Sequence, residues 1–494
     1  MISTLKQKTV KGVAWSLIER LGIQGMSLVL GVWLARLLTP SDYGLIAMIS
    51  VLIAVAAVFV ESGFGQAYVQ KKNVSDLDAN TIFYTNLVIS FVCYGCLWIA
   101  APAIAKFYNE PALVTLTRVM GSIVVINAFN TIQTAMLIRG IDFKRKTKVT
   151  LVATLISGVI GISAALLKFG VWSLVIQQLL NRILTTTGMW LTSKWRPSLI
   201  FSWKSFHSMF SFGGWVLAAG IMRTVFDNIY ILTIGKFFPV AQLGFYTKAK
   251  QFQAVAAQQL VGAVSIVAFP VLSQSQDNKP RLKEGVRSFL KYTMVFTAPL
   301  LVTLMVVAKP FVLLLLTEKW APMIPYLQLL CVVGFFYPIQ LVNVQVLQAQ
   351  GKSNLNFRIA VIKNLLRIVN IALMYRFGVI FIIIGEVITT FLALMINTYY
   401  TNRLLGYGLL EQLNDIKQII FSTILAGAAG ATAVYAMSNL YLNFVTGIII
   451  SLGGYVVLQY ILDRVFFTEL LQLKQNLVKK RNANETRPRN QKKV

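Results

Sequence analysis

The chain of 494 residues has few of the residue types on which most enzyme sites depend: three cysteines, one histidine and 17 acidic residues against 46 basic ones. The only histidine, His207, has no cysteine or acidic neighbours, which excludes the usual zinc site. Cys93 and Cys96 have a redox-like spacing, but they stand in an apolar run without a flanking strand or charge, which favours packing. No Gly-x-x-x-x-Gly-Lys-[Ser/Thr] phosphate loop occurs, which excludes ATP hydrolysis by that route. We therefore expect a protein that is not an enzyme and that holds no cofactor or metal.

Charged residues are scarce as well. They make up 13% of the chain, hydrophobic residues make up 56% and the mean hydropathy is +0.68, values that exclude an ordinary soluble domain. The apolar runs have the length of membrane-spanning helices, and the short alternating segments of an outer-membrane barrel are absent. The first run lacks a cleavage site and is expected to remain as an anchor. We predict an all-α, polytopic membrane protein with fourteen transmembrane helices, at 11–38, 41–64, 79–105, 112–138, 147–167, 171–193, 207–235, 240–272, 286–308, 322–349, 356–375, 379–402, 416–437 and 441–462.

The net charge of +29 would suit a nucleic-acid-binding protein, but its distribution indicates another cause. Basic residues in the first or last six positions of a predicted helix are counted with the adjoining loop or tail. Of the 46 basic residues, 31 then fall in the tails and even-numbered loops, seven in the odd-numbered loops and eight deeper within the predicted helices. By the positive-inside rule, both termini and the even-numbered loops face the cytoplasm, as in a bacterial inner-membrane protein, and no nucleic-acid partner is expected. The basic tail, 468–494, is expected to be disordered and to lie at anionic lipid, with a specific partner site as the alternative.

The sequence contains two copies of one hydrophobic unit. A tryptophan, a basic residue and a glycine recur at an offset of 200 residues, as Trp15, Arg36 and Gly44 against Trp215, Lys236 and Gly244. A second match, KFGV at 168–171 and RFGV at 376–379, has an offset of 208. Six helices separate the copies, so both enter the membrane from the same side and are related by an axis along the membrane normal. We expect six-helix lobes at 1–203 and 204–405, a site between them, and two extra helices within 406–467.

The two extra helices carry few polar residues. Gly427-x-x-Gly430 and Gly453-Gly454 predict close helix packing, either against the edge of the bundle or against another subunit.

Charged residues inside the predicted helices are the candidate binding groups. A lone charge at the bilayer centre costs roughly 2.5–3.5 kcal/mol, so each is expected to face protein or water. The basic ones are Arg20, Arg118, Arg182, Arg223, Lys248, Lys250, Lys363 and Arg367. The acidic ones are Glu19, Glu61, Asp227 and Glu386. The excess of positive charge suits an anionic ligand with several phosphates.

Helical spacing arranges these residues in polar stripes. Three such groups are Arg223, Asp227 and Tyr230; Lys363, Arg367 and Asn370; and Arg20 with Gln24. Near helix ends, snorkelling to the interface is the alternative to lining a cavity, and this applies to Arg118, Lys248, Lys250 and Lys363. Glu61 is either a helix cap or a protonatable coupling group.

Four segments carry a resemblance to a known family: KTVKGVAWSLIER at 8–20, LARLLTPSDYGLIAM at 34–48, ESGFGQAYVQKK at 61–72 and EKWAPMIPYLQLLCVVG at 318–334. They resemble the Wzx-type polysaccharide flippases of the multidrug/oligosaccharidyl-lipid/polysaccharide superfamily, and most closely the colanic-acid exporter branch. The resemblance implies two six-helix lobes around a central cavity, two extra helices, and transport of an undecaprenyl-diphosphate-linked oligosaccharide from the cytoplasmic to the periplasmic leaflet. It also implies arginines on the first, second and eighth helices. Arg20 matches the first, the second has Glu61 and no basic residue in its interior, and Lys248 and Lys250 are nearest on the eighth.

The hypothesis that follows is alternating access for surface polysaccharide synthesis, in a membrane shared with the polysaccharide polymerase and export machinery. The diphosphate and anionic sugars would be held by Arg20, Arg223 and either Arg182 or Arg367. An H⁺ or Na⁺ gradient would drive the cycle through Glu61, Asp227 or Glu19. Alternatives are a flippase for the peptidoglycan lipid precursor, a scaffold for the polymerase, and a multidrug cation antiporter, which the basic helix interior disfavours.

Overall fold

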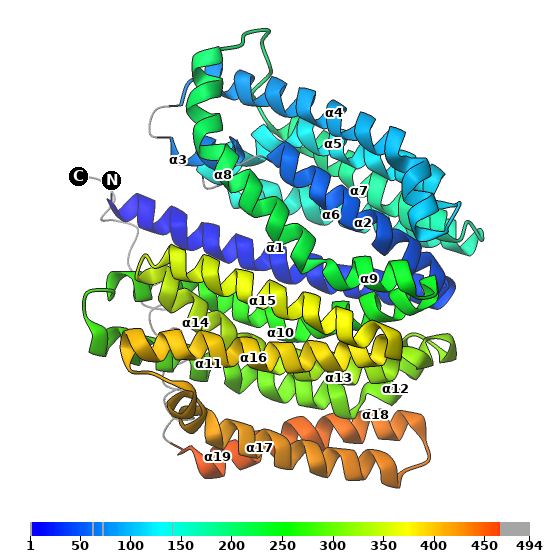
Figure 1. Ribbon diagram of the computed structural model, residues 1–494, viewed down its shortest axis with the longest axis vertical. Coiled ribbons are helices and arrows are strands. Elements are labelled where there is room, and N and C mark those ends of the chain that lie inside the picture. Colours follow the sequence, from blue (N-terminus) through cyan, green and yellow to red (C-terminus); the bar gives the residue numbers. More distant parts are fainter. Residues whose placement is uncertain (1, 62–63, 72–73, 141, 465–494) are drawn as a thin grey trace, which may run out of the picture. The chain divides into compact units, whose positions relative to one another are not determined.

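The computed structural model describes residues 2–61, 64–71, 74–140 and 142–464, and for some of these, including Arg20 and Glu61, the backbone only. Every regular element in these ranges is a helix (Figure 1). The basic tail at 468–494 lies outside the described residues. The chain forms two compact units, which follow spatial packing, whereas the predicted lobes follow the internal repeat. The lobe boundaries therefore stay a prediction.

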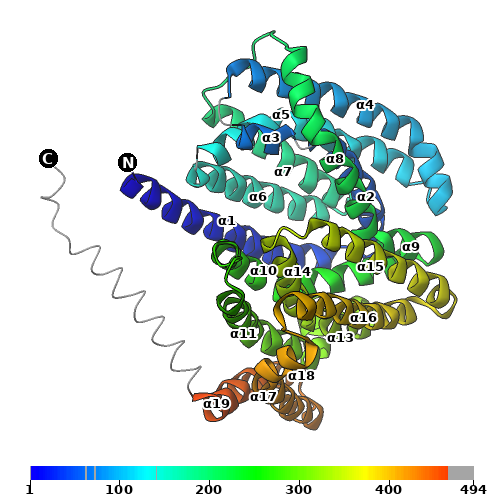
Figure 2. The ribbon, with the colours of Figure 1, turned by 60° about the vertical axis from the view of Figure 1, so that its left-hand side comes forward.

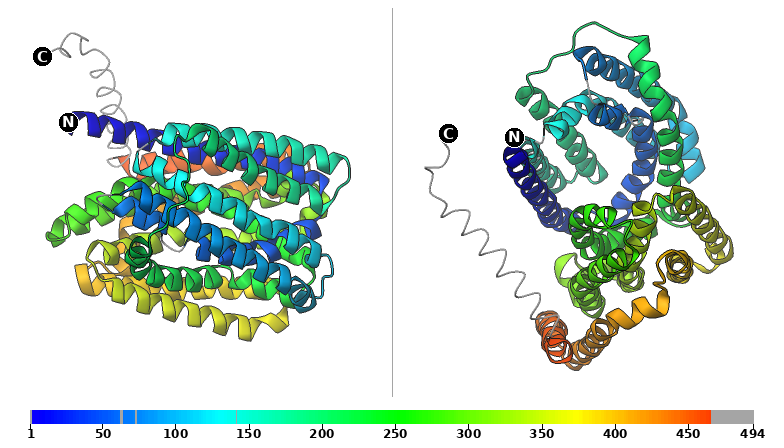
Figure 3. Two further views of the ribbon diagram at one scale, coloured as in Figure 1. Left: turned by 90° about the horizontal axis from the view of Figure 1, so that it is seen from above. Right: turned by 90° about the vertical axis from the view of Figure 1, so that its left-hand side faces the viewer.

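The first unit comprises Met1–Val255, Leu315–Leu330 and Val361–Thr389. The helices of its longest segment are α1 (Ile2–Leu37), α2 (Pro40–Glu61), α3 (Phe64–Gln70), α4 (Asp76–Tyr108), α5 (Leu113–Arg139), α6 (Phe143–Leu166), α7 (Val171–Thr192), α8 (Trp203–Asp227), α9 (Ile229–Phe237) and the start of α10 (Val240–Gln274). Helices α4 and α5 pack as neighbours, as do α6 and α7, and α1 lies against α6. Helix α8 packs across α2 (Figure 2). The blue and cyan helices are seen nearly end on in the right-hand view of Figure 3, so they run in roughly parallel directions.

The second unit comprises Ala256–Leu314, Cys331–Ala360 and Thr390–Val494. The remaining elements of the chain, in order, are α11 (Lys279–Val306), α12 (Ala308–Leu315), η1 (Glu318–Met323), α13 (Ile324–Phe335), α14 (Tyr337–Ala349), α15 (Ser353–Met374), η2 (Tyr375–Phe377), α16 (Val379–Leu405), α17 (Leu409–Ala436), α18 (Leu440–Ile448), η3 (Ile449–Gly453) and α19 (Gly454–Leu462). The core of the second unit is formed by side chains of α11, α14, α16, α17 and α19.

Each predicted span coincides with a helix or with a run of consecutive helices. Within the described residues, nine helical segments are long and apolar enough to cross a membrane, and α8 with α9 makes a tenth if the bent pair is one span. The chain is therefore a multi-pass membrane protein, and the count of fourteen spans stays a prediction.

Two glycines of α17 lie at close helix contacts inside the second unit. A Cβ atom at Gly427 would lie 2.4 Å from Val302 of α11, and one at Gly430 would lie 2.0 Å from the Ser451 hydroxyl. Only glycine allows these approaches. The predicted close packing is therefore confirmed for this pair of glycines, and it occurs within the unit. The same prediction was wrong for Gly453-Gly454, because no atom lies within 4 Å of an added Cβ at Gly453 and the nearest one at Gly454 is 3.6 Å away.

A charged cluster attaches α17 to α11 in the second unit. The guanidinium of Arg287 pairs with the Glu411 carboxylate and, at 2.8 Å, with Asp415. Lys283 pairs with Glu411 at 2.9 Å, and the Tyr407 hydroxyl donates to Asp415 at 2.8 Å. Burial, followed by the hydrogen bond to Asp415, raises the pKa of Tyr407 above its ordinary value, so the phenol stays a donor. We call these five residues the α11–α17 clamp.

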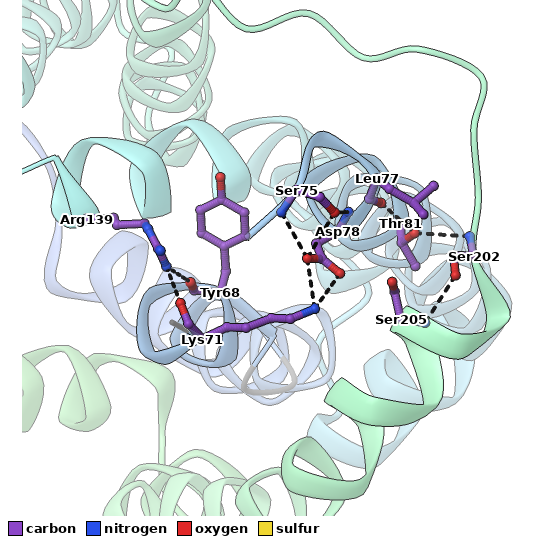
Figure 4. A network of polar contacts seen from close by, with 9 residues as sticks. All are labelled: Tyr68, Lys71, Ser75, Leu77, Asp78, Thr81, Arg139, Ser202 and Ser205. Atoms are coloured by element: carbon purple, nitrogen blue, oxygen red, sulfur yellow. Dashed lines mark hydrogen bonds and ion pairs between the residues drawn. The ribbon is translucent and has the colours of Figure 1, made fainter. Parts of the chain in front are cut away.

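The connection between α7 and α8, residues 193–202, is bonded to the first turns of α4 (Figure 4). Ser198 N–H donates to Asn80 Oδ1 at 2.8 Å, and Asn80 Nδ2 donates back to the Ser198 hydroxyl at 3.0 Å. Ser202 N–H donates to the Thr81 hydroxyl at 3.2 Å. These bonds satisfy backbone groups that a loop would otherwise leave to water, so the segment that links the predicted lobes is held in place.

A second set of bonds holds the same end of α4. The Lys71 amine lies 2.8 Å from Asp78, whose carboxylate also caps the helix through Ser75 N–H at 3.1 Å (Figure 4). The Arg139 guanidinium donates to the carbonyl oxygens of Tyr68 at 2.8 Å and Lys71 at 2.6 Å. The start of α4 is thus joined to α3 and to the end of α5 by charged groups outside the apolar part of the helices.

Candidate functional site

Helix α8 ends and α9 begins within one predicted span. The two helices meet at Asn228 with a bend of 47°. The Asn228 side chain donates to the Thr224 carbonyl at 2.8 Å, one turn back in α8. Asp227 and Asn228 are residue types whose side chains compete with the helix for local hydrogen bonds, and this pair is the sequence signal for the break. The prediction of one continuous helix over 207–235 was wrong at this point.

The bend carries a group of charged side chains. Asp227 Oδ2 lies 3.5 Å from Arg223 Nε, and Asp227 Oδ1 lies 3.6 Å from Arg367 Nη1 on α15. Arg367 also donates to the Phe226 carbonyl at 3.2 Å, at the end of α8. One carboxylate therefore serves two guanidinium groups, and Lys363 stands one turn before Arg367 on the same helix. We call Arg223, Asp227, Lys363 and Arg367 the cationic cluster.

Exposure shows which part of the cationic cluster is open. The side chain of Arg223 is 81% exposed, that of Asp227 54% and that of Arg367 34%. Because charge in hydrocarbon is costly, we take this open face to meet water or a polar ligand. Three cations with one carboxylate are incompletely neutralised, so an anion with two or more charges would complete the set.

The two polar stripes predicted from spacing face each other. Asp227 contacts Arg367, and one turn further on the Asn370 side chain donates to the Tyr230 hydroxyl at 3.2 Å. Tyr230 and Asn370 are 3% and 5% exposed. The stripes on α8–α9 and on α15 therefore form one surface, open at the charged end and closed at the amide end.

A buried carboxylate lies in the same unit. Tyr246 of α10 donates to Glu386 Oε2 of α16 at 3.1 Å, and the Lys250 amine donates to the Tyr246 hydroxyl at 3.2 Å. Glu386 is 9% exposed and Tyr246 is fully buried. The sequence predicted Glu386 and Lys250 as separate charges and missed Tyr246, which links them. No spacing rule joins residues 140 positions apart.

The other predicted cations lie elsewhere in the first unit. Lys248 is 3% exposed, its amine donates to the Gly31 carbonyl at 3.2 Å and it lies 4.6 Å from the Tyr43 ring centre. The Arg118 guanidinium lies 4.9 Å from the Trp98 ring centre. Arg182 is exposed on α7, and Gln24 is half-buried on α1. Lys248 and Arg118 thus lie at partners outside the cationic cluster, and the roles of all four residues stay predictions.

The remaining predicted acids differ from Asp227 and Glu386. Glu19 of α1 pairs with Lys146 of α6 at 3.1 Å and has a local counter-charge. The side chains of Glu61 and Arg20 lie outside the described residues. Within the described part of the chain, no group of three or more His, Cys, Asp or Glu side chains is arranged to hold a metal ion.

The chain is similar to proteins that are named for the biosynthesis or transport of polysaccharides. The model of a family described as polysaccharide biosynthesis protein matches residues 33–325, more than half of the chain. The lipopolysaccharide biosynthesis protein WzxC of Escherichia coli is 26% identical over 369 residues, 74% of each chain. The succinoglycan biosynthesis transport protein ExoT of Rhizobium meliloti is 25% identical over 331 residues, 67% of each chain. The teichuronic acid biosynthesis protein TuaB of Bacillus subtilis is 25% identical over 357 residues, 72% of this chain and 74% of that one.

Solved structures agree on the fold. The lipid II flippase MurJ, in an inward closed conformation, has a TM-score of 0.72 at 15% identity and covers 94% of this chain and 100% of its own. An inward-facing multidrug transporter of the MATE family, in the MOP superfamily, has a TM-score of 0.61 at 16% identity and covers 78% of this chain and 98% of its own. The chain therefore has the fold of these solved structures, and by the match over residues 33–325 it belongs to the polysaccharide biosynthesis protein family.

Proposed function

We propose that this protein is a flippase that moves a lipid-linked oligosaccharide from the cytoplasmic to the periplasmic leaflet of a bacterial inner membrane, with the diphosphate held at the cationic cluster. The observation that carries the proposal is the incompletely neutralised group of Arg223, Lys363 and Arg367 at the α8–α9 break, in which Arg223 is exposed and the other two are half-buried. The names of the relatives, which concern transport or synthesis of succinoglycan, lipopolysaccharide and teichuronic acid, support a surface polysaccharide as the end product.

Such a protein must supply polar groups that replace the water around the headgroup while it crosses the membrane. Sugar hydroxyls and a diphosphate would lose their hydration in hydrocarbon at a prohibitive free-energy cost, whereas the apolar isoprenoid tail is soluble in hydrocarbon. Guanidinium groups bind phosphate oxygens with paired hydrogen bonds, and Asp227 keeps both guanidiniums oriented in the absence of cargo. Under this proposal the headgroup enters at the cationic cluster while the tail stays in lipid.

An ion gradient is the proposed source of energy, with H⁺ or Na⁺ as the coupling ion. Of the predicted acids, Glu386 is favoured because it is buried and its oxygens contact the hydroxyl of Tyr246, which Lys250 contacts in turn. A change in the protonation or cation occupancy of one buried carboxylate would alter the charge of this network and the packing of α10 against α16.

The first test removes the cations of the cluster. We expect Arg223→Ala combined with Arg367→Ala to abolish surface polysaccharide and to leave lipid-linked oligosaccharide in the cytoplasmic leaflet. Arg376→Ala is the matched control, because Arg376 is an exposed arginine just after α15 that donates to the hydroxyl of the neighbouring Tyr375 at 3.0 Å. Normal polysaccharide in the double variant, at normal protein level, would exclude the cluster from the binding site.

The cargo is tested by complementation. Rescue of a strain that lacks its polysaccharide flippase supports the proposal. Rescue of peptidoglycan synthesis alone would instead identify the peptidoglycan lipid precursor as the cargo. The likeness to the lipid II flippase MurJ is the reason for testing this alternative. A cationic drug as cargo is disfavoured because the cationic cluster contains three basic side chains and one carboxylate.

A further inference from the structure

The repeat-related glycines contact each other's helices. A Cβ atom at Gly44 of α2 would lie 2.1 Å from the carbonyl oxygen of Val240, the first residue of α10. A Cβ atom at Gly244 of α10 would lie 1.9 Å from the carbonyl oxygen of Pro40, the first residue of α2. Positions 40 and 44 correspond to 240 and 244 in the repeat frame. The two contacts are thus one contact made twice, and neither tolerates a side chain.

The repeat-related basic residues also contact each other's repeats. Arg36, at the end of α1, donates to the carbonyl of Leu315, the last residue of α12, at 2.7 Å. Lys236, at the end of α9, donates to the carbonyl of Phe107, in the last turn of α4, and lies 4.4 Å from the ring centre of Phe107. Positions 36 and 236 share the offset of 200, and 107 and 315 share the offset of 208. Each cation therefore binds the carbonyl end of a helix from the other repeat, where the helix dipole favours positive charge.

One of the two sides has an additional attachment. Trp320, which is fully buried, donates from its indole N–H to the Ala35 carbonyl at 2.9 Å. Its ring lies edge-on to Tyr43 at 5.4 Å and to Phe245 at 6.0 Å. Lys319 donates to the Arg36 carbonyl at 2.6 Å. The EKW segment of the sequence is thus a cap on the last turn of α1.

We propose that the four contacts Gly44–Val240, Gly244–Pro40, Arg36–Leu315 and Lys236–Phe107, which we call the exchange contacts, form a gate that is closed in this structure, with Arg36 and Lys236 as its positioning residues. The gate opens when the first turns of α2 and α10 separate. All four contacts join odd-numbered loops of the predicted topology, so the gate closes the periplasmic end. The inference rests on the proposed function, because alternating access requires one end to close while the other is open.

The contacts have the properties that a repeatedly opened gate needs. Each cation binds a neutral carbonyl, which water can replace when the contact opens. The contacts of Gly44 and Gly244 are made with backbone carbonyl groups, so no side chain has to be rebuilt when they part. Trp320, which packs on Tyr43 of α2 and on Phe245 of α10, loses apolar contact when these helices separate, and this loss favours return to the closed state.

The test uses an added methyl group as a wedge. Cys93, Cys96 and Cys331 are replaced by alanine, and Ala35→Cys is introduced as a reporter because Ala35 is fully buried at the gate. We expect Gly44→Ala and Gly244→Ala each to raise labelling of this cysteine by a membrane-impermeant maleimide, added to the periplasmic side, by about tenfold. The two together give little further increase, since they open one gate. Gly95→Ala is the control, because no atom lies within 4 Å of its added Cβ.

A second experiment does not depend on tolerance of alanine at the glycines. In this experiment Arg36→Cys and Leu315→Cys are combined, and the two cysteines are bridged by a short bifunctional thiosulfonate. We expect the bridge to hold the gate closed and the export rate to fall near zero. Reduction of the bridge should restore export. Unchanged export in the bridged protein, labelling that rises for only one of the two glycines, or labelling from the cytoplasmic side alone would overturn the gate. Labelling needs no cargo, so a gate that responds while no polysaccharide is rescued would reject the proposed function and leave this inference standing.

Discussion

The α11–α17 clamp and the exchange contacts hold helices together in different ways. In the clamp, Arg287 binds two carboxylates, and each of these binds a further side chain. In the exchange contacts, Arg36 and Lys236 bind neutral backbone carbonyls, those of Leu315 and Phe107. Ion pairs with shared partners lose several bonds at once when they part, whereas a cation leaving a carbonyl exchanges one bond for a bond to water. The first arrangement suits a permanent attachment and the second suits a contact that breaks in every cycle.

The largest effect on stability is expected where the exchange contacts have their one-sided cap. Trp320→Ala removes a fully buried indole and is expected to lower the free energy of unfolding by about 3–5 kcal/mol. Trp320→Phe keeps most of the apolar contact and loses the bond to Ala35, so we expect a loss of about 1–2 kcal/mol. Thermal unfolding in detergent measures both. Equal losses for the two variants would show that the cap depends on the hydrogen bond alone.

Loss of the clamp is expected to reduce stability without opening the gate. Arg287→Met leaves Glu411 and Asp415 without their shared cation, and because the guanidinium is partly exposed we expect a loss of about 1–3 kcal/mol. Lys417→Met is the control, since Lys417 is exposed on the same helix, α17, and bonds to Asn414. Labelling of Ala35→Cys should stay at its basal level in both variants. A rise in Arg287→Met would remove the distinction between clamp and gate.

The exchange contacts should show the opposite behaviour. Arg36→Met and Lys236→Met are each expected to cost less than about 1 kcal/mol, because an exposed cation regains water. Labelling of Ala35→Cys should nevertheless rise by about two- to fivefold. Arg376→Met, at another exposed helix connection, controls for loss of charge. A large fall in unfolding temperature with unchanged labelling would make Arg36 and Lys236 structural in the sense of Arg287.

The smallest effect is expected at Lys248. Its amine is buried on a single carbonyl and two aromatic rings, so an apolar chain of similar length satisfies the site as well. Lys248→Met should change the free energy of unfolding by less than about 1 kcal/mol and leave export intact. Loss of export at normal protein level would instead restore Lys248 to the cavity lining that the sequence predicted.

The helical fold could be predicted because each apolar run has the length of a helix that spans a membrane. The repeat also predicted which residues matter at the ends of α1 and α9. Arg36 and Gly44 stood out because they recur in the second repeat as Lys236 and Gly244. Their partners were not predicted, because they are backbone carbonyl groups, such as those of Val240 and Pro40. Every residue has a backbone carbonyl, so the amino-acid type does not indicate which one is contacted.

The candidate site was predictable in part for similar reasons. The spacing of Arg223, Asp227 and Arg367 on their helices placed each charge on a stripe, and the structure brings the stripes together. The break at Asn228 was missed because hydrophobic periodicity continues through it. The clamp was missed because Arg287 and Glu411 are 124 residues apart and each alone reads as an ordinary loop charge. The repeats share the glycine and the basic residue at the helix end, whereas the charges of the cationic cluster have no counterpart: Arg223 corresponds to Ile23 and Asp227 to Ser27.

The paired glycine contacts have a consequence for ancestry. In a symmetric dimer, a surface in which residue i touches j necessarily has j touching i. Gly44 on Val240 and Gly244 on Pro40 have this form within one chain. A half-length ancestor would have met a second copy of itself through the same glycine and the same basic residue. Fusion then freed each half to acquire its own charges while the inherited dimer interface kept both in register.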